Sequence, residues 1–227
     1  MNINSKKIEV AVFGATGLIG SILIKYLKQY SKFKKINLVL RSPLDLKGEN
    51  IKIHKIDLFK KSEILHSLNT SKVVFVAIGT TLSKVKGNKE KYRRIDFGIT
   101  KDIADSCKEL GIDKLILVSS SGANLKSKNF YLNLKGSIEK YVTDLNLKSV
   151  SILRPSLLLG KRNEKRFVEK LAQIVIPKIS FFMPSKYKAI KAETVAKAML
   201  QLSTTESKGV KIFHYKEIMD LSNKFKI

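Results

Sequence analysis

The feature that most constrains the fold is a glycine-rich turn directly after an apolar strand. Residues 8–13, IEVAVF, predict a buried strand, and residues 18–30 predict the helix that follows it. The turn between them is GATGLIG, in which Gly14 allows a sharp turn, Gly17 allows close approach of a pyrophosphate and Gly20 allows close helix packing. Free N–H groups at the helix N-terminus favour an anion. The turn therefore predicts a dinucleotide site, and the alternative is a turn that holds no ligand. A Walker A loop is excluded, because no Gly-Lys-Ser/Thr triplet completes this turn.

Short apolar strands alternate with helices along the rest of the chain. Further strands are expected at residues 36–40, 51–56, 72–79, 114–121 and 149–155, and helices at residues 89–111 and 129–145. After Pro155 we expect a helix near residues 164–176, another from Glu193, and a strand and terminal helix within residues 210–225. This pattern predicts an α/β fold of the Rossmann type, with a doubly wound parallel sheet and helices on both faces. We expect one domain over residues 1–227, in which residues 156–190 form a small lobe covering the substrate side.

Composition limits the class of protein. Of 227 residues, 44% are hydrophobic, which is enough for a substantial core, and Cys107 is the single cysteine, so no internal disulfide can form. The N-terminus shows no secretory signal and no apolar run is long enough to cross a bilayer, so we expect a cytoplasmic protein. The formal net charge of +25 comes from lysines scattered along the chain, which indicates a basic surface rather than a nucleic-acid partner.

The end of the second strand indicates which dinucleotide is preferred. NAD-binding folds of this type place Asp or Glu there to hold the ribose 2′-hydroxyl. Arg41 and Ser42 occupy this position instead. A cation suits the 2′-phosphate of NADP, so we expect NADP(H) to be preferred, with NAD(H) possible as a cofactor. An arginine that simply ends a strand in water is the alternative.

A serine-rich strand end and the helix after it supply the candidate catalytic residues. Tyr131 and Lys135 are four residues apart and lie on one helix face. A phenol titrates near about pH 10, and a nearby ammonium favours its ionised form, which makes it useful in proton transfer. Lys135 would also bond the nicotinamide ribose, while Ser120, or Ser121 as second choice, would hold the substrate carbonyl oxygen. Surface packing of the helix is the alternative for this pair.

Five segments together resemble the atypical NADP-binding branch of the short-chain dehydrogenase/reductase superfamily. They are GATGLIG, VAIGTT at residues 76–81, SSSGAN at 119–124, NFYLNLKG at 129–136 and ILRPSLLLG at 152–160. The resemblance implies a set of cofactor-binding residues, which are Gly14, Thr16, Gly17, Leu18 and Ile19 at the pyrophosphate, Arg41 and Ser42 at the 2′-phosphate, Asp57, Ile78 and Gly79 at the adenosine, and Pro155, Ser156, Leu157 and Leu158, after Arg154, at the nicotinamide. Asp96 departs from the family, because many relatives carry Asn there.

These observations rank the possible functions. We expect an NADP(H)-dependent oxidoreductase that transfers hydride to or from a small carbonyl or quinone-type substrate. The alternative is a non-catalytic NADP-binding module that senses redox state or regulates a partner, and a nucleic-acid-binding protein is the weakest reading. No metal site is expected, because His54, His66 and His214 are far apart and no Cys or carboxylate cluster has ligand spacing. Either a monomer or a homodimer is compatible with the sequence.

Overall fold

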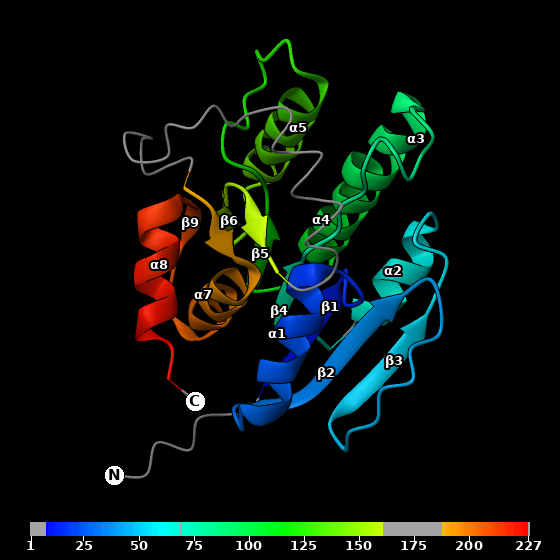
Figure 1. Ribbon diagram of the computed structural model, residues 1–227. Coiled ribbons are helices and arrows are strands. Elements are labelled where there is room, and N and C mark those ends of the chain that lie inside the picture. Colours follow the sequence, from blue (N-terminus) through cyan, green and yellow to red (C-terminus); the bar gives the residue numbers. More distant parts are fainter. Residues whose placement is uncertain (1–7, 69, 161–187, 227) are drawn as a thin grey trace.

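A seven-stranded parallel sheet forms the centre of the molecule. The computed structural model describes residues 8–68, 70–160 and 188–226. The strand order is β3-β2-β1-β4-β5-β6-β9, and every neighbouring pair is parallel (Figure 1). The bounds are β1 Ile8–Phe13, β2 Phe33–Leu40, β3 Ile51–Lys55, β4 Val73–Val76, β5 Lys114–Val118, β6 Ser149–Leu153 and β9 Gly209–Phe213. The order runs outward from β1 in both directions, which confirms the predicted doubly wound Rossmann-type sheet.

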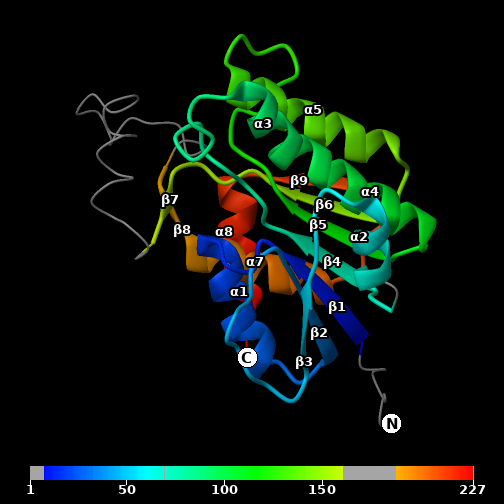
Figure 2. The ribbon, with the colours of Figure 1, turned by 90° about the vertical axis from the view of Figure 1, so that its right-hand side faces the viewer.

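Helices cover both faces of this sheet (Figures 1 and 2). One face carries α1 Leu18–Gln29, α7 Ala192–Thr204 and α8 Tyr215–Lys224, and the other carries α2 Lys61–Leu68, α4 Ile99–Glu109 and α5 Phe130–Asp144. Alternate side chains of β1 enter the two cores, Val10 and Val12 on the α1 side and Ala11 and Phe13 on the α4 side. Apolar runs without polar alternation are typical of parallel strands buried on both faces. None of the described helices combines the length and the apolar character needed to span a membrane.

The structure differs from the sequence expectations in three places. Helix α2 and a two-stranded parallel sheet, β7 Leu158–Leu159 with β8 Ile190–Lys191, were not predicted. The helix expected over residues 89–111 is three consecutive elements, α3 Lys89–Arg93, the π-helical turn η1 Arg94–Gly98 and α4. In η1 the Ile99 N–H donates to the Arg94 carbonyl, five residues earlier, which widens the helix locally. The helix expected near residues 164–176, and residues 161–187 of the expected substrate-side lobe, lie outside the described residues.

The glycine-rich turn after β1 is held by close backbone contacts. Gly14 has φ +83°, in the left-handed region, and a Cβ there would overlap the Ala77 backbone at the end of β4. The Gly17 N–H donates to the Gly14 carbonyl at 2.9 Å. A Cβ at Gly20 would overlap that same carbonyl, so α1 can approach the turn only with glycine at this position. The geometry at Gly14 and Gly20 agrees with the structural roles expected from their spacing.

We expect Gly20→Ala to lower the free energy of unfolding by about 1–3 kcal/mol, because the added methyl group meets backbone atoms that cannot move independently. Urea unfolding of the two proteins measures this free-energy difference. Gly79→Ala is the matched control, because a Cβ at Gly79 meets nothing within 4 Å. Equal stabilities for Gly20→Ala and Gly79→Ala would contradict the close approach of α1.

Candidate functional site

The predicted site residues follow the carboxyl ends of six strands. Because the strands are parallel, these ends lie at one edge of the sheet, where ligands bind in doubly wound folds. The turn at residues 14–20 follows β1, and the residues after the other strands are Arg41 and Ser42 after β2, Asp57 after β3, Ile78 and Gly79 after β4, Ser120 and Ser121 after β5, and Pro155, Ser156, Leu157 and Leu158 after β6. Residues distant in the sequence are therefore placed along one edge. Their contacts with a cofactor stay predictions.

The N-terminus of α1 offers backbone donors to an anion. Gly17 is its N-cap and provides no side-chain cap, and the first turn contains no acidic residue. Thr16 is exposed, whereas the Ile19 side chain is 6% exposed and belongs to the core. The first N–H groups of a helix have no partner within the helix, so those of Leu18 and Ile19 are suited to a pyrophosphate. Ile19 can contribute only its backbone there.

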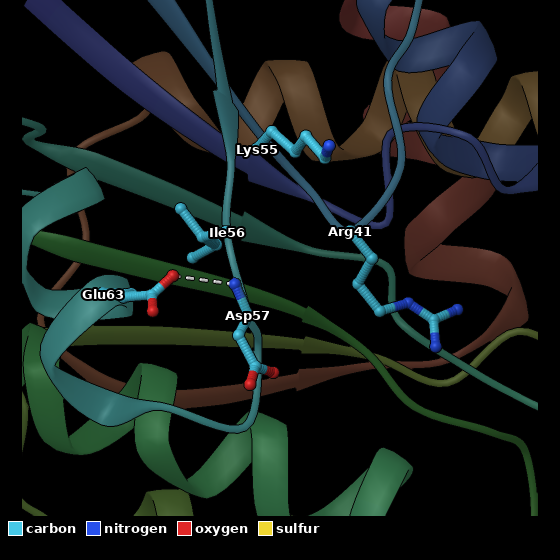
Figure 3. Close-up of a pocket in the computed structure, with 5 residues that line it drawn as sticks. All are labelled: Arg41, Lys55, Ile56, Asp57 and Glu63. Carbon is cyan, nitrogen blue, oxygen red and sulfur yellow. Dashed lines mark hydrogen bonds between the residues drawn. The ribbon is translucent and has the colours of Figure 1, made fainter.

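A cavity of about 400 Å³ lies at the ends of β2 and β3, and its lining residues are Arg41, Lys55, Ile56, Asp57 and Glu63 (Figure 3). Two of them, Arg41 and Asp57, are residues that the sequence assigns to the adenosine end. The Glu63 carboxylate accepts the Asp57 N–H at 2.8 Å and pairs with Lys60 at 3.2 Å. These two contacts hold the pKa of Glu63 below its ordinary value. Sequence reasoning missed Lys55, although its position at a strand end was a usable signal.

Tyr131 and Lys135 lie one turn apart on α5. The helix begins after Asn129, whose side chain accepts the Leu132 N–H at 3.1 Å. Tyr131 is 38% exposed, whereas Lys135 is buried, with Nζ 5.9 Å from the centre of the Tyr131 ring. The Ser120 hydroxyl donates to the Ser121 carbonyl at 3.3 Å. Within the described part of the chain, no hydrogen bond joins Ser120 to the Tyr131 hydroxyl.

The π-helical turn η1 brings a buried carboxylate to Lys135. Asp96 is 1% exposed; its Oδ2 lies 3.2 Å from Lys135 Nζ, and its Oδ1 accepts the Thr80 N–H at 2.9 Å. The contact with Nζ is an ion pair without an aligned hydrogen bond, since no hydrogen-bond partner for Oδ2 is found among the described residues. The Tyr92 hydroxyl donates to the Thr80 carbonyl at 2.9 Å. Asp96 and Tyr92 thus hold the backbone N–H and the carbonyl of one residue, Thr80, in the loop after β4.

A second buried ion pair fixes the middle of α5. Glu139 accepts two hydrogen bonds from Arg154 Nε, at 3.0 and 3.1 Å, another from Arg154 Nη2, and one from the Ser119 hydroxyl. The carboxylate side chain is 6% exposed and the guanidinium side chain 21%. The contact ties α5 to the ends of β5 and β6. Sequence reasoning missed Glu139, although its place four residues after Lys135 puts it on the same helix face.

The ionisation of Asp96 predicts a pH-dependent stability. Burial raises the pKa of Asp96, against the opposing effects of Lys135 and the Thr80 N–H. The Asp96 carboxyl therefore binds its proton more tightly in the folded than in the unfolded state, and the resulting contribution to stability is lost as the pH rises above about 4 through the raised pKa. We expect the unfolding free energy of wild type, relative to Asp96→Asn, to fall between about pH 4 and pH 7. Urea unfolding over this range measures it.

Asp105 provides a control in which the unfolding free energy should change with pH in the opposite direction. Burial opposes its ionisation, but hydrogen bonds from Lys101 and Tyr141 outweigh burial and lower the pKa of Asp105. Its contribution is present above about pH 4 and lost as the pH falls through the lowered pKa. Wild type relative to Asp105→Asn should therefore gain stability as the pH rises. If the unfolding free energy of wild type relative to each variant changed with pH in the same direction, the raised pKa of Asp96 would be contradicted.

Curated relatives of this chain are yeast proteins. The chain is 33% identical to "Protein FMP52, mitochondrial" of Debaryomyces hansenii over 199 residues, which cover 85% of this chain and 86% of that protein. It is 32% identical to the protein of the same name in Candida glabrata over 232 residues, covering 97% and 98% of the two chains. The Saccharomyces cerevisiae protein of this name is 33% identical over 157 residues, covering 68% of each chain.

These names correct the expected location. The cytoplasmic prediction is wrong, because the relatives are named mitochondrial. The prediction relied on the absence of an apolar secretory signal and of an apolar run long enough to cross a bilayer. Mitochondrial targeting segments are basic and amphipathic, so neither of these two criteria could detect one.

Solved structures of low sequence identity share the fold. MoeE5 in complex with UDP-glucuronic acid and NAD superposes with a TM-score of 0.71 at 18% identity, covering 95% of this chain and 81% of that one. A UDP-glucose 4-epimerase from Thermotoga maritima gives 0.70 at 14% identity, covering 97% and 84%. A family model described as NAD(P)H-binding matches residues 14–206, from the glycine-rich turn to just beyond α7. The chain therefore belongs to this NAD(P)H-binding family, as an atypical member of the short-chain dehydrogenase/reductase superfamily.

Proposed function

We propose that this protein is an NADP(H)-dependent oxidoreductase that transfers hydride to or from a small carbonyl or quinone-type substrate. The observation that carries the proposal is the pair on α5, where a partly exposed phenol, Tyr131, stands one turn before a buried ammonium, Lys135. When bound at the glycine-rich turn, the dinucleotide supplies the hydride. The protein would orient both reactants and exchange a proton at the Tyr131 hydroxyl.

Exposed apolar side chains support an apolar substrate. Leu82 follows β4, Leu125 precedes α5 and Leu159 lies in β7, and each is exposed by 39–48%. All three belong to segments that follow the carboxyl ends of strands, on the side where Tyr131 stands. Ligand sites are lined mostly by apolar side chains, with a few polar groups that fix orientation. We therefore expect ketones, aldehydes or quinones with apolar substituents rather than charged sugars.

The Asp96–Lys135 ion pair favours a second candidate, a non-catalytic NADP-binding module that senses redox state or regulates a partner. A carboxylate 3.2 Å from Nζ offsets the positive charge that would otherwise assist the phenol in proton transfer. Such a module would bind NADPH without oxidising it in the presence of acceptors. The relatives' names make mitochondria the compartment in which we would look for either activity.

Tyr131→Phe tests the catalytic proposal. We expect the rate of NADPH oxidation with a responsive acceptor to fall by about 10²–10⁴-fold, because the variant has no hydroxyl to exchange a proton. The assay follows NADPH absorbance across a panel of aldehydes, ketones and quinones. Tyr141→Phe is the matched control, since Tyr141 lies on the same helix but bonds Asp105 on α4. Equal rates for wild type and Tyr131→Phe would remove Tyr131 from the mechanism.

Arg41→Ala tests the choice of cofactor. Removing a charge-assisted hydrogen bond to the 2′-phosphate should weaken NADPH binding by about 1.5–3 kcal/mol and leave NADH binding nearly unchanged. Fluorescence titration with both dinucleotides measures this preference. Arg93→Ala is the control, because Arg93 is exposed on α3 and stacks on Phe97 instead. A preference that survives in Arg41→Ala would show that Arg41 does not determine it.

A further inference from the structure

Two cations from neighbouring strands face the cavity at the adenosine end. Lys55 is the last residue of β3 and is the register partner of Leu40, the last residue of β2, so Arg41 follows immediately beside it. Both side chains line the 400 Å³ cavity. Figure 3 shows them on the same side of the chain at the end of β3, with Glu63 on the other side. The parallel register therefore places the two residues at one cavity, although Figure 3 shows their charged groups extending in different directions.

No ion-pair partner for either cation is found among the residues that the structure describes. In residues 8–68, 70–160 and 188–226, no hydrogen bond or ion pair of the Arg41 or Lys55 side chain is found, whereas the nearby anions have partners. Glu63 is bonded to the Asp57 N–H and to Lys60. Asp57 Oδ1 accepts the Phe59 N–H at 3.0 Å, and Figure 3 shows its carboxylate directed away from Lys55 Nζ. Two cations that line one cavity, with no ion pair found for either among the described residues, favour an anion from outside the chain.

The connection between β2 and β3 leaves the cavity lined by Arg41 and Lys55 open to solvent. Residues 41–50 form no helix, and β3 is an edge strand of the sheet, so Arg41, Ser42 and Lys55 are all exposed. The cavity can therefore admit a ligand group without displacing any packed element. A phosphate monoester carries roughly −1.5 to −2 charges at neutral pH, more than one arginine offsets. Two cations on different strands match it better than one.

We propose that Lys55 is a specificity-determining residue that binds the 2′-phosphate of NADP(H) together with Arg41. This inference rests on the proposed NADP(H) function. Arg41 supplies a planar fork suited to two phosphate oxygens, and Lys55 supplies a compact charge with three donors. Because NAD(H) lacks the 2′-phosphate, Lys55 contributes to the preference between the two dinucleotides and not to binding of their common part.

The test compares Lys55→Met with Lys52→Met, an exposed lysine on the same strand that does not line the cavity. Dissociation constants are measured for NADPH and NADH by fluorescence, and for 2′,5′-ADP and ADP by calorimetry, so that no turnover is required. We expect Lys55→Met to lower the NADPH-over-NADH preference by roughly three- to tenfold, because the contact is exposed and partly screened. The 2′,5′-ADP-over-ADP preference should fall equally, and Lys52→Met should change neither.

Further variants distinguish a failure of the role proposed for Lys55 from a failure of the proposed cofactor. Lys55→Glu should lower the preference more than Lys55→Met, and thermal unfolding confirms that each variant is folded. If Arg41→Ala lowers the preference while both Lys55 variants leave it unchanged, Arg41 acts alone and the inference is overturned, although the proposed cofactor stands. If wild type binds neither NADPH nor 2′,5′-ADP, the proposed cofactor fails and the role of Lys55 fails with it.

Discussion

Parallel hydrogen bonding across seven strands is the constraint on which the site depends. It aligns the carboxyl ends of β1 to β6 at one edge, so that segments separated by more than a hundred residues meet there. At the centre, the Gly14 turn lies so close to the Ala77 backbone that no side chain fits between β1 and β4. The first N–H groups of α1, which begins at the end of this turn, have no partner within the helix and are available to a ligand. The sheet thereby brings the backbone segments of the candidate site together.

Buried charge fixes the helix that carries the candidate catalytic pair. Charged groups are costly to remove from water, and they persist in a protein interior where a partner offsets that cost. Lys135 meets Asp96 from the π-helical turn, and Glu139 meets Arg154 from the end of β6. These contacts approach α5 from two different directions. Tyr131 is thus presented on a helix whose position is set by polar contacts as well as by packing.

The side chains along the carboxyl edge of the sheet differ in charge and polarity from one part to another. Arg41 and Lys55 line a cavity at the ends of β2 and β3, and no ion pair of either is found in the described part of the chain, whereas exposed leucines follow β4 and β6. This difference underlies our proposals of NADP(H) as the cofactor and of an apolar acceptor as the substrate. The net charge of +25 adds a general attraction for anionic ligands, although it does not distinguish among them.

Local sequence determined most strands of the sheet and most of the helices that pack on it. Apolar runs and the spacing of Gly14, Gly17 and Gly20 were enough to predict the first strand, its turn and the doubly wound sheet, because these depend on neighbouring residues and on period. The pairing of Lys135 with Asp96, of Glu139 with Arg154, and of Lys55 beside Arg41 was decided only by the tertiary structure. Each pair joins residues from different elements, and strand register or one widened helical turn decides whether they meet.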